Sequence, residues 1–135
     1  MYALLMVCLA FDLSAIKMEP NLERRSERAI DNASAAMDAA RDAASAGDSA
    51  KAKAALEEVR DSVDLSYQSL VDSGKSARRN PKFFKRAELK TRELMRRLEG
   101  LAQAVDSEDR TFVESVRERV STVHDDLIKD IMQKK

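Results

Sequence analysis

Four segments of similar length carry apolar residues at alternating spacings of three and four, and this spacing constrains the fold more than any other feature. On an α-helix, with about 3.6 residues per turn, side chains at such spacings lie on one face. The third segment continues the series over three heptads with a single polar interruption: Phe84, Ala87, Thr91, Leu94, Leu98, Leu101 and Val105. Each segment therefore presents an apolar face that must pack against another helix.

The other three segments repeat the pattern. The first contains Ile30, Ala33, Met37, Ala40 and Ala44. The second contains Leu56, Val59, Val63, Tyr67 and Leu70. The fourth contains Val113, Val116, Val120, Val123 and Leu127. These side chains are the predicted core, and we expect the Tyr67 hydroxyl to reach its rim.

Residues that begin or end helices separate the segments. Pro20-Asn21 opens the first helix, and Gly47-Asp48 ends it and caps the second. Gly74 ends the second helix, Asn80-Pro81 opens the third, and Asp106-Ser107 opens the fourth. Each segment is about 25 residues long, which corresponds to about 38 Å of helix. Equal lengths and short connections favour antiparallel neighbours.

The sequence therefore predicts an all-α fold, an antiparallel four-helix bundle of long helices that forms one domain over residues 20–135. Thirteen alanines between Ala29 and Ala55 make its N-terminal hairpin alanine-rich, which permits close approach of the two backbones. Gly100 could end the third helix early, but the apolar series runs through it. We expect one helix there, at a cost of about 1 kcal/mol.

Residues 1–15 form a candidate signal peptide or apolar N-terminal segment. Ala3 to Phe11 is an unbroken apolar run of nine residues, within the length of about 7–15 expected of a signal-peptide core. The alternative is a strand or short helix that packs on the bundle. Export predicts a location in the periplasm or cell envelope, and the alternative is the cytoplasm.

The residues indicate no catalytic chemistry, so we predict that the protein is not an enzyme. No phosphate-binding glycine loop, zinc-protease motif or nucleophile elbow is present, and Cys8 is the only cysteine. His124 is the only histidine, lies at the edge of an apolar face, and is predicted to have no chemical role. We predict no catalytic, cofactor-binding or metal-binding residue, and no small-molecule substrate is evident.

The charge is unevenly distributed. Basic and acidic residues balance at 24 each over the whole chain, which leaves no long-range field. Residues 75–100, however, carry ten basic and three acidic residues, a net charge of +7, whereas every other stretch is negative. The third helix is therefore a basic rod in an otherwise acidic protein.

The side of this helix away from the core forms a candidate surface for an anionic partner. Its basic residues are Lys82, Lys85, Arg86, Arg92 and Arg96, and Leu89 lies among them. In one explanation the excess charge pairs with acidic residues on adjoining helices and sets their order. In the other, the side binds lipid headgroups, envelope polymer or nucleic acid, although aromatic residues for base stacking are absent from it.

The segment from Asn80 to Gly100, with Pro81-Lys-Phe-Phe-Lys-Arg at its start, resembles a segment of small uncharacterised bacterial proteins that carry secretion signals and are helical throughout. The resemblance extends loosely over residues 21–132. It implies a bacterial, exported origin and transfers no site residues. We thus expect a non-enzymatic interaction or scaffold protein of the cell envelope, with a protein partner or self-association. The alternative is a binder of an anionic polymer, nucleic acid or membrane surface, through the third helix.

Overall fold

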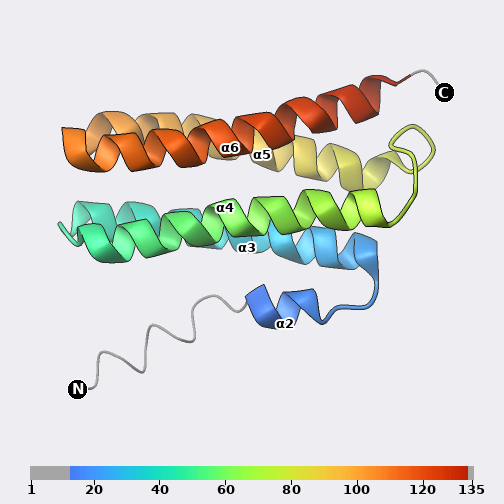
Figure 1. Ribbon diagram of the computed structural model, residues 1–135, viewed down its shortest axis with the longest axis horizontal. Helices are drawn as coiled ribbons and strands as arrows, with labels where there is room; N and C mark the ends of the chain where they lie inside the picture. Colours follow the sequence, from blue (N-terminus) through green and yellow to red (C-terminus); the bar gives the residue numbers. More distant parts are fainter. Residues whose placement is uncertain (1–12, 134–135) are drawn as a thin grey trace.

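The computed structural model describes residues 13–133 and, within that range, consists of helices joined by turns (Figure 1). The four long helices are α3 (Leu22–Ser45), α4 (Ser49–Asp72), α5 (Pro81–Ala104) and α6 (Ser107–Met132). A short helix, α2 (Leu13–Lys17), precedes them. The predicted all-α bundle is confirmed, and Gly100 lies inside α5 as expected.

The predicted starts and stops of the helices are also confirmed. Asn21, Asp48 and Asp106 each accept a hydrogen bond from the backbone N–H three residues later, at 2.9–3.1 Å. This contact satisfies one of the donors that the first helical turn leaves without a partner. Gly47 and Gly74 follow α3 and α4 with φ angles of 77° and 69°, which glycine adopts without the strain that a side chain would cause.

The long helices form two antiparallel hairpins, α3–α4 and α5–α6, stacked as two layers (Figure 1). Helix α5 lies beside α3, and α6 lies beside α4. In both of these contacts between layers the neighbouring helices run in the same direction (Figure 1). Residues 73–80 connect α4 to α5 across the diagonal of the bundle. Antiparallel packing thus holds within each hairpin, and parallel packing joins the hairpins.

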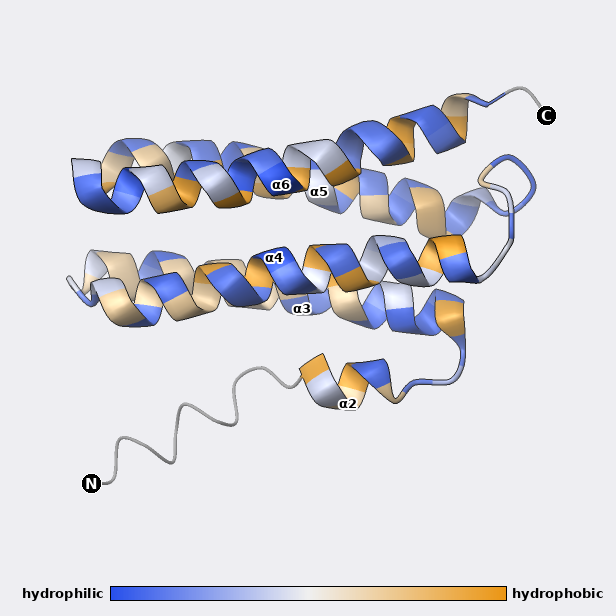
Figure 2. Ribbon diagram, in the orientation of Figure 1, coloured by the Kyte–Doolittle hydropathy of each residue, from blue (hydrophilic) through white to orange (hydrophobic). Residues whose placement is uncertain are grey.

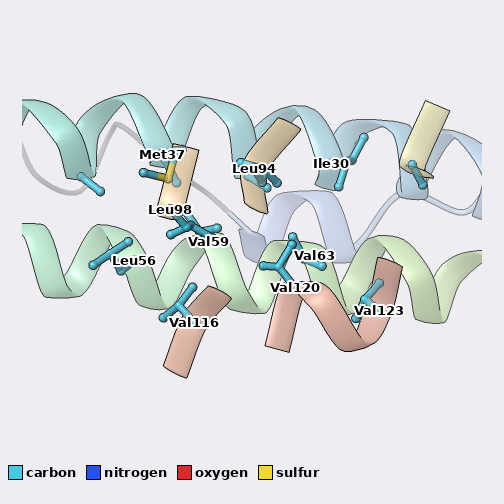
Figure 3. Close-up of a cluster of buried hydrophobic side chains, with 14 of the residues drawn as sticks. Ile30, Met37, Leu56, Val59, Val63, Leu94, Leu98, Val116, Val120 and Val123 are labelled. Carbon is cyan, nitrogen blue, oxygen red and sulfur yellow. The ribbon is translucent and has the colours of Figure 1, made fainter. Parts of the chain in front are cut away.

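One core lies between the layers and receives side chains from all four long helices (Figure 3). One side chain from each long helix lies near its centre and is at most 1% exposed: Met37, Val59, Leu98 and Val116. The opposite faces of the helices are polar, so apolar and polar patches alternate along each ribbon (Figure 2). Burial of the apolar faces is the main stabilising term, at about 25 cal/mol per Å² of apolar surface removed from water.

The contact between α3 and α4 combines alanines with a layer of buried hydroxyls. Ala29, Ala33, Ala36 and Ala40 are fully buried. The Ser66 hydroxyl donates to the backbone oxygen of Ser26 at 3.0 Å, and the two hydroxyl oxygens lie 2.9 Å apart. Nearly two turns further along α3, the Asn32 amide donates to the Ser62 hydroxyl at 2.8 Å and to the Glu58 carboxylate at 2.9 Å. These groups satisfy one another inside the hairpin.

Helix α2 packs against α3 and α4 and was not among the four predicted helices. Ile16 is its buried residue, and the Arg25 guanidinium donates to the backbone oxygen of Glu19 at 2.7 and 2.9 Å. Residues 13–15 of the candidate signal segment belong to α2, and residues 1–12 lie outside the described range. No helix within residues 13–133 is both long enough and apolar enough to span a bilayer.

Candidate functional site

Part of the basic charge of residues 75–100 is neutralised on the side that faces α3. Three cations there each meet a carboxylate of α3, as the pairing explanation expects. The pairs are Lys75–Glu23 (2.6 Å), Arg86–Asp31 (2.8 Å) and Arg97–Asp38, with Glu27 as a second partner of Arg86 at 3.7 Å. Their order along α3 matches their order along the chain from the connecting loop into α5, as the parallel packing of α3 and α5 requires. Such exposed pairs contribute about 0.2–1 kcal/mol each and favour this neighbour over others.

The side of α5 that faces α6 carries a second charged cluster. The Glu88 carboxylate accepts two hydrogen bonds from the Arg92 guanidinium, at 2.8 and 2.9 Å, and lies 2.9 Å from Nε2 of His124. The bonds from Arg92, and to a lesser degree the contact with His124, hold the pKa of Glu88 below its usual range. His124 thus lies at the edge of the core as predicted, but the sequence did not identify Glu88 as its partner.

The remaining side of α5 points away from both neighbours, and we call it the outer face: Lys82, Lys85, Leu89, Arg92 and Arg96. Lys82, Lys85 and Arg96 are exposed and form no salt bridge within the described residues. The Lys82 ammonium lies 5.2 Å from the centre of the Phe83 ring. Leu89 is 54% exposed in the middle of the face.

Further cations without a salt-bridge partner in the described range adjoin the outer face. They are Arg78 and Arg79 in the connecting loop and Lys90 on α5. Among the acidic residues of 75–100, Glu93 forms no salt bridge with any described residue, whereas Glu88 and Glu99 both have cationic partners. The excess positive charge of residues 75–100 therefore persists at the surface after the internal pairs are counted.

Exposed apolar side chains of α6 lie next to the start of the outer face. The contacts Glu99–Arg117 and Glu88–His124 fix the antiparallel register of α5 and α6. If this register is extended by one to two turns toward the C-terminal end of α6, Ile128 and Met132 lie beside the first turns of α5. These side chains are 37% and 72% exposed. Cationic and apolar groups therefore share one region of the surface.

The five predicted cations thus divide between two environments. Lys82, Lys85, Arg92 and Arg96 are exposed, although Arg92 also binds Glu88. Arg86 is half-buried at the boundary with α3, where two carboxylates hold it. We therefore assign Arg86 to the contact between the layers and the other four to the outer face.

A cleft of about 590 Å³ opens between the two hairpins at the end where their turns lie, and the sequence did not predict it. Met37, Leu56, Leu101 and Val113 are its largest buried apolar lining residues. Small residues contribute much of the remaining lining: Ala44, Gly47, Ala52, Gly100 and Ala104. In the sequence, the alanine-rich run and the glycine inside α5 were the available signals of a cleft. Neither shows that the small side chains of the two hairpins lie at the same end of the bundle.

The Tyr67 side chain joins α4 to α6. The Tyr67 hydroxyl donates to the Asp130 carboxylate at 2.9 Å and is partly buried at the rim, as expected. Burial, then the hydrogen bond to Asp130 and the charges of Asp130 and Asp126, raise the pKa of this phenol well above its usual range. No three His, Cys, Asp or Glu side chains of residues 13–133 gather into an arrangement that could hold a metal ion.

No protein-family model matches the chain, and neither a curated protein nor a solved structure does. The two candidate sites, the outer face of α5 and the end cleft, are therefore argued from their own geometry.

Proposed function

We propose that this protein is a non-enzymatic interaction module that docks through the outer face of α5 onto an anionic membrane surface, within the cell envelope if the chain is exported. The observation that carries the proposal is the set of cations left without a carboxylate partner within the described residues. Arg86 and Arg97, by contrast, sit against carboxylates of α3, and their charges are balanced within the fold.

The composition of the face favours lipid over nucleic acid. Leu89, Ile128 and Met132 expose apolar side chains among or beside the cations, and such groups gain by entering the interfacial layer of a bilayer. Against a phosphate backbone they would gain nothing. Stacking on unpaired bases requires exposed aromatic rings, but Phe83 packs against the core and Phe84 is buried.

The expected affinity is modest. A Lys or Arg side chain close to an anionic bilayer contributes about 1 kcal/mol. Lys82, Lys85 and Arg96, together with Arg78 and Arg79, would supply about 5 kcal/mol, which corresponds to a dissociation constant of about 0.2 mM in accessible lipid. Binding of this strength is reversible, and self-association would strengthen it by presenting two faces at once.

Co-sedimentation with vesicles tests the proposal. The chain should bind vesicles that contain phosphatidylglycerol and not vesicles of phosphatidylcholine alone, and binding should fade in about 1 M salt, where the Debye length is about 3 Å. The combined variant Lys82→Glu, Lys85→Glu, Arg96→Glu should lose the binding. Its fold should persist, since these side chains are exposed and make no salt bridge with any described residue.

The matched control reverses three exposed cations elsewhere: Arg24→Glu, Lys51→Glu, Lys129→Glu. It changes the net charge equally and should keep the binding. Loss of binding in both variants would indicate a response to net charge and would contradict a specific face. Undetectable binding at low salt would refute the proposal. Tighter binding to duplex DNA than to vesicles at equal salt would identify nucleic acid as the partner instead.

The expected location is tested separately. Sequencing the N-terminus of the mature protein from the fractionated host should show cleavage within the first fifteen residues if the chain is exported. Met1 retained in the cytosolic fraction would contradict export and direct attention to the cytoplasmic face of a membrane, where the same outer face could act.

A further inference from the structure

The end cleft raises the question of why α5 contains a glycine. Gly100 does not have a positive φ, and a Cβ added there would meet no heavy atom within 4 Å. Neither the backbone conformation nor close packing therefore requires glycine at this position. In a helix interior, glycine is nonetheless less favourable than alanine by about 1 kcal/mol. Nothing in the fold offsets this cost, and Gly100 lines the cleft.

The cleft has the size and lining of a small-molecule site. Its volume of about 590 Å³ falls within the usual range of ligand pockets, about 300–1,000 Å³. Met37, Leu56, Leu101 and Val113 provide an apolar lining, and Phe112 adds an aromatic ring. A hydrocarbon chain fits the apolar part of this lining better than a polar metabolite does, and the charged lining residues leave room for a polar end group.

Two lining cations are available to a ligand. The Lys53 ammonium lies 5.0 Å from the centre of the Phe112 ring and forms no salt bridge with any described residue. Arg41 has only its neighbour Asp42 within reach, at 3.9 Å, and both side chains are exposed. Because α3 and α4 are antiparallel, with Asn32 opposite Ser62, Arg41 and Lys53 lie at the same level of the hairpin.

The lining carboxylates are less available. Asp106 accepts a hydrogen bond from the backbone N–H of Asp109, and Asp109 accepts one from the Ser49 hydroxyl at 2.8 Å. Together with Glu108 they lie at the first turn of α6, whose positive dipole end offsets their charge. The cleft is therefore more receptive to an anion than its equal numbers of acidic and basic lining residues indicate.

We propose that the end cleft binds a single-chain amphipathic anion, such as a medium-chain fatty acid. The hydrocarbon chain lies along the apolar lining, and the carboxylate is held by Arg41 or Lys53. Gly100 keeps the wall of the cleft clear of a side chain. This site is separate from the outer face of α5 and does not depend on the proposed membrane docking.

Titration calorimetry with dodecanoate, below its micelle concentration, tests the proposal. The wild-type protein should bind it saturably, and Gly100→Leu should weaken binding at least tenfold while raising the thermal midpoint, because leucine is the better helix former. Ala44→Leu fills the cleft from the opposite hairpin and should also weaken binding, so the conclusion does not rest on one variant. Lys53→Gln and Arg41→Gln should weaken dodecanoate binding while leaving the binding of dodecanol unchanged.

Three results with the wild-type protein and the cleft variants would overturn the proposal. They are the absence of saturable dodecanoate binding to the wild-type protein, unchanged affinity in both cleft-filling variants, and equal loss of dodecanoate and dodecanol binding in the cation variants. The variant Lys82→Glu, Lys85→Glu, Arg96→Glu should bind dodecanoate normally. Loss of binding there would move the ligand to the outer face of α5 and would contradict the cleft assignment.

Discussion

Replacement of Thr91 by valine should stabilise the protein. Thr91 is fully buried in the apolar face of α5, and its hydroxyl donates to the backbone oxygens of Ala87 and Glu88 at 2.9 and 3.0 Å. Both oxygens also accept helical hydrogen bonds, so neither loses its only partner when the hydroxyl is removed. The hydrogen bond of Thr91 therefore satisfies only its own hydroxyl group, and the backbone oxygens do not need it.

The size of the effect follows from three contributions. Loss of the hydrogen bond costs about 1 kcal/mol, whereas removal of a hydroxyl from an apolar site returns about 1–3 kcal/mol. The added methyl group buries a further increment of about 0.8 kcal/mol. For Thr91→Val these contributions sum to a net gain of about 1–3 kcal/mol in the free energy of unfolding, and each kcal/mol is equivalent to about 3–5 °C in the thermal midpoint.

Urea unfolding followed by far-ultraviolet circular dichroism measures this change. Thr91→Ala is the matched control: it removes the methyl group as well as the hydroxyl, and should fall below Thr91→Val by about 1–2 kcal/mol. If Thr91→Val loses more than about 1 kcal/mol with its helix content intact, the hydroxyl must have a further partner between the hairpins. The argument from satisfied backbone oxygens would then be wrong.

Three other changes have definite expected outcomes. Leu98→Ala leaves a cavity at the centre of the core, where Leu98 is 0% exposed, and should lower the free energy of unfolding by about 2.5–5 kcal/mol in the same urea assay. Asp48→Ala removes the cap of α4 and should cost about 1 kcal/mol, whereas Asp48→Asn should cost little. The pKa of Glu88 is lowered in the folded state, so its carboxylate stabilises the fold at pH values above its unfolded pKa of about 4.3, and this stabilisation is lost as the pH falls through the folded pKa. Wild type should be more stable than Glu88→Gln at neutral pH, and the difference should shrink in thermal melts as the pH falls below the unfolded pKa of about 4.3 and through the lower folded pKa; a difference that stays constant over this fall would show that the charge of Glu88 is not involved.

Helix bounds were predictable because local residues determine them. Asn21, Asp48 and Asp106 act through their own side chains on the next turn, and Gly47 adopts a backbone angle that other residues avoid. The buried faces were predictable for a similar reason, since spacings of three and four define a face whatever lies opposite it. The bounds of the short helix α2 were not predicted, although a short N-terminal helix packed on the bundle was the alternative to a signal peptide.

The order of the helices was not predictable, since an apolar face at heptad spacing fits several neighbours equally well. The pair Arg86–Asp31 shows the difficulty. Arg86 lies close to the outward side of α5 on a helical projection, and only the position of α3 turns it into a contact between layers. The end cleft has the same origin, because its lining combines Ala44 of one hairpin with Gly100 of the other.

The buried hydroxyls between α3 and α4 carry a consequence for how this hairpin finds its alignment. Alanine surfaces are smooth, and two of them could slide by a turn with little loss of contact. Such a slip would separate Ser66 from Ser26 and Asn32 from Ser62. Buried or partly buried polar groups would then lose their hydrogen-bond partners. The hydrogen bonds of these hydroxyls therefore select a single register of α3 against α4. This register also determines which residues of the two helices line the end cleft.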